Sequence, residues 1–253
     1  MSQETDITSR KVIRITGEDT RKFLQGLVTN DVKKLDDGMV YAAMLTPQGK
    51  YLADFFLVPQ GEDVLVDVGA AVAPVLMQKF TMFKLRSKVA FEETGLAVTL
   101  GTGEMPEGAF ADPRHPDLGW RSYGEGPASI WDGYEATRIG LGIPATAVEL
   151  IPNDTYILEA RFDEINGVDF KKGCYVGQEV TARMKHKIEM RKGLRVVDVD
   201  GGAPVGTEII HNGKAAGVLY SQSGGRALAF LRFDRAAPEM QAGDALVKYD
   251  ASA

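Results

Sequence analysis

The single cysteine of the chain, Cys174, lies in a segment whose residue types could support thiol chemistry. The segment Lys171–Glu179 reads KKGCYVGQE, so glycines and two lysines frame the cysteine. Residues 177–186 can form a short helix because Val180 and Met184 share one face, which would place Cys174 just before a helix N-terminus. Such a position beside ammonium groups favours the nucleophilic thiolate. Free cysteines are often small core residues, but the density of polar residues and glycines here favours a functional loop.

The charge of the chain is unevenly distributed around this segment. Residues 171–195 contain eight basic residues against Glu179 and Glu189, a net charge of +6, whereas the whole chain carries −6. A local basic patch on an acidic protein indicates an anionic ligand or partner, with a solvated charged surface as the alternative. We expect no direct nucleic-acid binding, because Tyr175 is the only aromatic residue available there for base stacking.

Composition narrows the class of protein further. The 253 residues, 44% hydrophobic and 25% charged, are typical of a globular protein. No apolar run reaches the ~18 residues of a membrane span, and residues 1–6 resemble neither a signal peptide nor an Arg-rich presequence. One cysteine fits a reducing compartment, so we expect a cytoplasmic, bacterial protein. The three histidines, at positions 115, 186 and 211, are too far apart in sequence to suggest a metal site.

The hydrophobic pattern predicts an α+β region that positions these residues. A strand at Lys11–Ile15 precedes a helix from Glu18 to a turn at Thr29–Asp31. A hairpin follows, with strands at Met39–Leu45 and Tyr51–Val58 around the turn Thr46–Gly49. The remaining predicted elements are a strand at Val64–Val68, a helix at Ala71–Leu85, strands at Val89–Glu92 and Ala97–Leu100, loops over 101–126, and a helix at Trp131–Leu141.

After Gly193 the pattern changes to short strands separated by glycine-containing turns. The predicted strands are Leu194–Val199, Glu208–His211, Ala215–Ser221, Ala227–Phe233 and Ala245–Tyr249. This spacing is typical of a small antiparallel barrel. We therefore expect two regions, residues 1–190 and residues 191–253.

Several motifs resemble one protein family. The stretch Lys172–Glu179 matches the K-G-C-(F/Y)-x-G-Q-E signature of the YgfZ family, which is related to the glycine cleavage T-protein and includes a mitochondrial iron–sulfur cluster assembly factor. Phe23–Val32 resembles the opening motif shared by these relatives, Leu45–Phe56 resembles their hairpin, and Asn166–Phe170 precedes the cysteine motif as expected. The resemblance covers nearly the whole chain. It implies a T-protein-like folate-binding core with a C-terminal β-barrel.

The resemblance also implies site residues. Asp54 matches the T-protein aspartate that approaches the reactive nitrogens of tetrahydrofolate, although an ordinary strand aspartate is the alternative. Gly140 stands where T-protein has a pterin-binding glutamate. We expect Cys174, Lys172 and Asp54 to be catalytic residues. The expected cofactor-binding residues are Asp54, Asn30, Tyr175 and Arg183, and the motif residues are Lys172, Gly173, Cys174, Tyr175, Gly177, Gln178 and Glu179.

The function implied by the resemblance is iron–sulfur cluster assembly or repair, affecting radical and tRNA-modifying enzymes, with weak binding of tetrahydrofolate or a derivative. Four thiolates usually hold a cluster, so one cysteine implies a cluster shared with a partner, namely an A-type carrier, and 4Fe–4S client enzymes as further partners. One alternative is a folate-dependent one-carbon transferase or demethylase. Another is a non-catalytic adaptor with a vestigial cavity.

Overall fold

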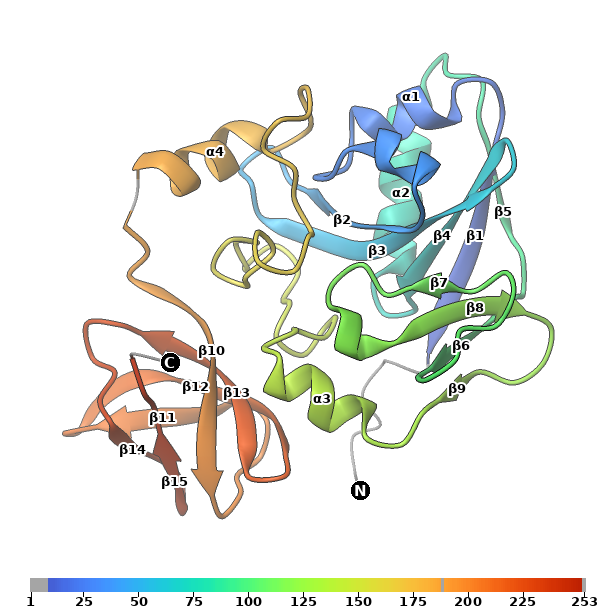
Figure 1. Ribbon diagram of the computed structural model, residues 1–253. Helices are drawn as coiled ribbons and strands as arrows, with labels where there is room; N and C mark the ends of the chain where they lie inside the picture. Colours follow the sequence, from blue (N-terminus) through green and yellow to red (C-terminus); the bar gives the residue numbers. More distant parts are fainter. Residues whose placement is uncertain (1–8, 188, 252–253) are drawn as a thin grey trace.

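The computed structural model describes residues 9–187 and 189–251. Residues 1–8, which include the stretch 1–6 expected to carry no targeting signal, lie outside the described part. Within the described residues the chain forms one antiparallel sheet, a second sheet that is mixed, four α-helices and a closed barrel (Figure 1). The predicted α+β class with a small antiparallel barrel is therefore confirmed. None of the described helices is long and apolar enough to cross a membrane.

The first sheet has the strand order β2-β3-β4-β1-β5. Its strands are β1 (Arg10–Thr16), β2 (Val40–Leu45), β3 (Tyr51–Gln60), β4 (Asp63–Gly69) and β5 (Ala90–Glu93). Two helices, α1 (Thr20–Gln25) and α2 (Ala73–Lys84), pack on one face of this sheet (Figure 1). The 3₁₀ helix η1 (Val32–Asp36) follows α1.

The opposite face of the first sheet is covered by the second sheet and by a long irregular segment. The second sheet has the order β7-β8-β6-β9, with β6 (Ala97–Gly101), β7 (Phe110–Ala111), β8 (Trp120–Gly124) and β9 (Ser129–Ile130). Helices η2 (Pro116–Leu118) and α3 (Tyr134–Gly140) belong to this layer, and residues 141–177 follow without a helix or strand. Strands β2 and β3 are therefore buried on both faces, which explains their nearly continuous apolar sequence.

The barrel closes in the order β10-β13-β12-β11-β14-β15. Its strands are β10 (Lys192–Asp200), β11 (Thr207–His211), β12 (Lys214–Ser223), β13 (Arg226–Arg232), β14 (Glu239–Ala242) and β15 (Ala245–Lys248). Inward-facing aliphatic side chains fill its interior. Helix α4 (Gln178–Lys187) precedes it, so the expected boundary near residue 190 falls between α4 and β10.

The structure differs from the sequence prediction in several segments, and the short elements η1 and β9 were not predicted. The stretch 101–126, expected to be loops, contains β7, η2 and β8. Strand β14 was not predicted, because its four residues carry only one large apolar side chain, Met240. Helix α1 ends at Gln25 and is shorter than the expected helix, since residues 26–31 turn back toward the sheet.

Candidate functional site

Cys174 is exposed at the surface, in the loop that connects the irregular segment to α4. The backbone N–H of Gln178, the first residue of α4, donates to the carbonyl of Tyr175 at 3.2 Å. The thiol therefore lies four residues before the helix, as the sequence predicted. The loop from Asp169 to Gly177 is called the cysteine loop below.

The neighbouring Lys172 does not extend into solvent; it anchors the cysteine loop from beneath. Its buried ammonium donates to three backbone carbonyls, those of Gln25 at 2.8 Å, Val28 at 2.5 Å and Asn30 at 2.9 Å. A lysine ammonium has three N–H donors, so these contacts use all of them. Burial lowers the pKa of Lys172 to about 8, although the carboxylates of Asp31 and Asp169 oppose this shift. The geometry thus gives Lys172 a structural contact, and its expected catalytic role stays a prediction.

A second anchor of the cysteine loop is formed by Asp169. Its carboxylate accepts the backbone N–H groups of Lys171 at 2.7 Å and Lys172 at 3.1 Å, and it pairs with the ammonium of Lys34 at 2.7 Å. Burial alone would raise the pKa of Asp169, but the hydrogen bonds from Lys34 and from the loop amides outweigh it and lower the pKa. Asp169 through Lys34, and Lys172 through its three carbonyls, therefore tie the cysteine loop to residues 25–34.

Asn30 belongs to the same network and was expected to bind a cofactor. Its amide donates to the carbonyl of Tyr41 at 2.8 Å and to that of Asn166 at 2.7 Å, while its side-chain oxygen accepts from Lys34 at 2.9 Å. Both amide hydrogens and the oxygen of the Asn30 side chain are thus used in hydrogen bonds within the protein. Asn30 therefore joins β2 to the segment before the cysteine loop, and its expected role in cofactor binding stays a prediction.

Gly177 ends the cysteine loop with a left-handed backbone, φ +85°. A Cβ at this position would lie 2.7 Å from the carbonyl oxygen of Thr46 and 2.9 Å from Cβ of Leu45. Glycine is thus required because the loop lies directly against the β2–β3 turn. By contrast, a Cβ on Gly173 would meet no atom within 4 Å, so the backbone beside Cys174 is open to solvent.

The other residues of the predicted site do not converge on one point. Tyr175 is buried beneath the loop, with the ammonium of Lys172 5.1 Å from its ring centroid. Burial also raises the pKa of Tyr175. Glu179 and Arg183 are exposed on α4, and within the described residues neither makes an ion pair. Gln178 begins α4 and is half-buried.

Asp54 lies far along the chain from this loop, on β3, and is only 3% exposed. Three hydroxyl groups donate to its carboxylate: Tyr41 at 3.0 Å, Tyr51 at 2.6 Å and Thr146 at 2.7 Å. Burial, and then the charge of Asp54, raise the pKa values of Tyr41 and Tyr51 well above 10, which keeps both phenols protonated as donors. The alternative of an exposed strand aspartate is excluded.

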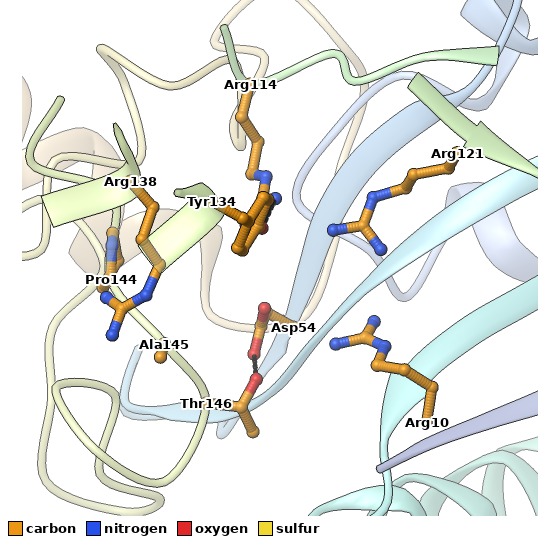
Figure 2. A pocket seen from close by; sticks show the side chains of 9 residues that line it. All are labelled: Arg10, Asp54, Arg114, Arg121, Tyr134, Arg138, Pro144, Ala145 and Thr146. Carbon is orange, nitrogen blue, oxygen red and sulfur yellow. Dashed lines mark hydrogen bonds between the residues drawn. The ribbon is translucent and has the colours of Figure 1, made fainter. Parts of the chain in front are cut away.

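Asp54 lines a small cavity that four arginines surround (Figure 2). The arginines are Arg10, Arg114, Arg121 and Arg138. In Figure 2 the first three extend toward the space beside Asp54, and the guanidinium of Arg138 lies beside Pro144. None of the described residues that line the cavity comes from the basic segment 171–195. The basic segment and Asp54 therefore do not face one cavity.

The arginines are held by buried carboxylates that the sequence did not single out. Arg114 binds Asp112 through two hydrogen bonds, at 3.0 and 2.8 Å, and Arg121 contacts Asp112 and Asp67, both at 3.1 Å. Asp67 also accepts from Arg10 at 2.6 Å. Burial alone would raise the pKa of Asp112, but Arg114 and Arg121 outweigh it and hold the pKa at about 2. Asp112 and Arg114 lie in a stretch expected to be loop, where charged residues are ordinary.

The fourth arginine connects the core to the barrel. Arg138 on α3 donates to the hydroxyl of Ser221 on β12 at 2.8 Å and lies 3.5 Å from the buried carboxylate of Glu149. Glu149 in turn accepts the backbone N–H of Ser221 at 3.1 Å. Gly140, in the same helix, faces the barrel as well: a Cβ there would lie 3.3 Å from the guanidinium of Arg226.

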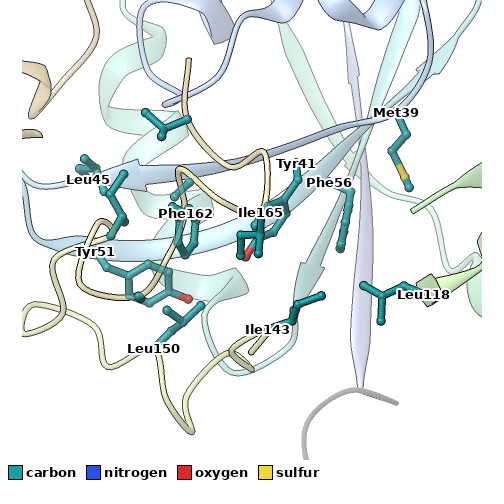
Figure 3. Packing of buried hydrophobic residues seen from close by; sticks show 14 of the residues in the cluster. Met39, Tyr41, Leu45, Tyr51, Phe56, Leu118, Ile143, Leu150, Phe162 and Ile165 are labelled. Carbon is teal, nitrogen blue, oxygen red and sulfur yellow. The ribbon is translucent and has the colours of Figure 1, made fainter. Parts of the chain in front are cut away.

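The cavity does not fit a tetrahydrofolate. Its volume is about 20 Å³, roughly the space of one water molecule. Tyr41, Tyr51, Ile143 and Leu150 are packed around this part of the core (Figure 3), and Asp54 already accepts three hydrogen bonds. Gly140 offers no carboxylate to a pterin. As the structure has it, the cavity leaves no space for the pterin ring.

Comparisons with known proteins agree with this fold. Residues 191–252 match the family described as CAF17, C-terminal beta-barrel domain. The glycine cleavage system aminomethyltransferase T from Bartonella henselae has a similar structure, with a TM-score of 0.74 over 97% of this chain and 84% of that chain at 14% identity. The predicted T-protein-like fold with a terminal barrel is thereby confirmed.

The curated relatives are iron–sulfur cluster assembly factors. The chain is 37% identical over 221 residues to the mitochondrial IBA57 homolog of Mycosarcoma maydis, which covers 74% of this chain and 55% of that protein. It is 30% identical over 273 residues to the mitochondrial IBA57 of Mus musculus, covering 89% and 76% respectively. The chain thus spans only 55% of the length of the fungal relatives from Mycosarcoma maydis and Neurospora crassa.

These names overturn one prediction. The relatives are named as mitochondrial proteins, so the expected cytoplasmic location is wrong. The resemblance to the folate-binding family that includes the mitochondrial assembly factor is confirmed, since the match to the mouse and human proteins extends over most of both chains. On this similarity and on the shared fold, the chain belongs to the IBA57 family.

Proposed function

We propose that the protein acts in iron–sulfur cluster assembly, with the thiol of Cys174 as the group that reaches a cluster. The observation that carries this proposal is the combination of an exposed thiol with a firmly anchored loop. Lys172 and Asp169 fix the loop just before Gly173, and Gly177 lies against the β2–β3 turn after it, so the sulfur is presented at a defined place on the surface. Its relatives are named as assembly factors for such clusters.

A partner must supply the remaining cluster ligands. A cluster ordinarily takes four thiolates, whereas this chain has one cysteine. Within the described residues no group of three or more His, Cys, Asp or Glu side chains is arranged to hold a metal. We therefore propose that Cys174 contributes one ligand to a cluster carried by an A-type carrier protein, and that 4Fe–4S enzymes, including radical and tRNA-modifying enzymes, are the final recipients.

Electrostatics supports an acidic partner. On α4, next to the cysteine loop, Arg183 and Lys187 are exposed, and Lys171 is exposed within the loop itself. A basic surface raises the association rate of an acidic protein and orients it during encounter. In this proposal α4 guides the carrier toward the thiol, while Gly173 leaves the sulfur sterically accessible.

The tetrahydrofolate implied by the family resemblance has no step in this proposal, because the cavity beside Asp54 does not fit it. The same observation disfavours the one-carbon transferase. The adaptor with a vestigial cavity is compatible with the closed cavity and differs from our proposal only in the role of Cys174. An adaptor would keep its activity when the thiol is removed.

Reconstitution tests this function. The purified protein treated with iron and sulfide should show no cluster absorbance, whereas mixing it with a cluster-loaded A-type carrier should give a coloured complex on size-exclusion chromatography. Cys174→Ala should reduce this complex, and Val205→Ala, a change at an exposed barrel position, should not. A stable cluster on the isolated protein, or a Cys174→Ala complex equal to the wild-type complex, would refute the proposal.

A further inference from the structure

A groove lies between the C-terminal ends of α1 and α2, outside the site described so far. Its volume is about 890 Å³, and its apolar lining includes Phe23, Leu27 and Phe83. The backbone N–H of Lys88 donates to the carboxylate of Asp19 at 2.8 Å, which holds the segment after α2 beside α1 (Figure 1). The groove is therefore built from two fixed elements.

Leu85 stands at the rim of this groove with its side chain in solvent. It is 85% exposed, the largest exposure among the large hydrophobic side chains in the described part of the chain, and Met82, one turn earlier, is 52% exposed. Leu85 also has a left-handed backbone with φ +43°, which is unusual for a leucine. Clustered apolar side chains that remain in solvent mark a surface that a partner covers.

The charges around the groove indicate the chemistry of that partner. Lys22 and Arg86 line the groove, and neither has an ion-pair partner among residues 9–187 and 189–251. The acidic groups nearby are engaged, since Asp19 accepts the N–H of Lys88 and Glu18 pairs with the ammonium of Lys88. Asp19 also lines the groove, so the lining holds two basic side chains against one acidic one, and this excess of positive charge complements acidic residues.

The groove and the cysteine loop both contact the turn that follows α1. Gly26 and Leu27 line the groove. The carbonyls of their neighbours, Gln25 and Val28, accept the ammonium of Lys172. The turn that follows α1 therefore borders the groove and also anchors the cysteine loop. A single protein bound at Cys174 can thus contact the loop and the groove together.

We infer that this groove docks an acidic segment of the protein that brings the cluster to Cys174, with one large apolar side chain of that segment seated between Phe23, Leu27 and Phe83. This inference rests on the proposed function for the identity of the partner. Leu85 covers the seated side chain, and Lys22 and Arg86 pair with flanking carboxylates. Because these contacts do not involve the cluster, they also hold the carrier when it is empty.

The first test compares variants in their affinity for the cluster-free A-type carrier. Leu85→Asp and the double variant Lys22→Glu/Arg86→Glu should each weaken binding by about tenfold or more, equivalent to roughly 1.4 kcal/mol. All three side chains are exposed, so the fold should survive, which thermal unfolding checks. Matched controls on the barrel, Val205→Asp and Lys214→Glu, should bind as the wild type does.

A second test does not depend on the carrier. A short synthetic peptide with one leucine between glutamates, titrated into the labelled protein, should shift the NMR signals of residues 22–27 and 83–87, and Leu85→Asp should abolish the shifts. The same peptide with lysines in place of glutamates should not bind. If the wild type fails to bind the carrier in either form, the proposed function fails and the peptide titration alone decides on the groove. Wild-type carrier affinity in both groove variants, or a peptide that shifts none of these signals, overturns the inference.

Discussion

The ammonium of Lys172 donates a hydrogen bond to the carbonyl oxygen of Val28, although 144 residues separate them in the chain. This contact, with two parallel ones to Gln25 and Asn30, makes the position of the cysteine loop depend on the turn after α1. The thiol of Cys174, two residues after Lys172, is thus positioned by contacts between segments that lie far apart in the sequence. Helix α4 begins four residues after Cys174.

Replacing Lys172 by methionine should loosen the loop. Three carbonyls would lose their donor, and an unmade buried hydrogen bond costs about 1–3 kcal/mol, so we expect unfolding free energy to fall by an amount in this range. Amide hydrogen exchange at residues 171–178 should accelerate. Lys171→Met, at the exposed neighbouring position, is the matched control and should change neither. Unchanged exchange in Lys172→Met would show that the loop holds its shape without this anchor.

Asp54 should matter for stability and not for folate binding. Asp54→Ala leaves the hydroxyls of Tyr41, Tyr51 and Thr146 without their acceptor, and we expect a loss of about 1–3 kcal/mol measured by denaturant unfolding. Asp54→Asn, which keeps one acceptor oxygen, should lose less. Calorimetry with tetrahydrofolate should give no binding heat for the wild type. Measurable heat that Asp54→Ala removes would mean that the cavity opens to admit the ligand.

Asp112 should contribute to sensitivity toward acid. Its pKa in the folded protein is about 2, against 3.8 ordinarily, so the folded state binds fewer protons than the unfolded chain in this range. The stabilisation that the Asp112 carboxylate contributes is therefore fully present above pH ~3.8 and is lost as the pH falls toward about 2. Asp112→Asn should be less stable than the wild type at neutral pH, and this difference should shrink between pH 4 and 2. A constant difference across that range would contradict the assignment.

Much of the fold could be predicted from local sequence, but the site could not. Strands β2 and β3 and most barrel strands were found because their apolar runs and glycine turns are local signals. The roles of Lys172 and Asn30 depend on carbonyls more than a hundred residues away, which no local pattern encodes. Likewise, Arg114 and Asp112 lie in the stretch expected to be loops, and only the packing of the second sheet against the first buries both and brings Arg114 to the cavity beside Asp54.

The protein should not replace the glycine cleavage T-protein, whose fold it shares. Gly140 carries no carboxylate, and a buried hydrogen bond to a charged group is worth about 1.5–3 kcal/mol, or roughly ten- to a hundredfold in affinity. Reconstituting glycine cleavage with this protein in place of T-protein should yield no methylene-tetrahydrofolate. Restoring a glutamate by Gly140→Glu should not rescue the reaction, since the cavity remains closed. Clear turnover by the wild type would reject this view.

The most direct test of the role of Cys174 is the ratio of two affinities, for the cluster-loaded and the cluster-free A-type carrier. If the thiol ligates the cluster, the wild type should prefer the loaded carrier by about tenfold or more, a difference of roughly 1.4 kcal/mol. In Cys174→Ala this ratio should fall to about one, because only the cluster-independent contacts remain. A Cys174→Ala variant that keeps the full wild-type preference would contradict the proposal.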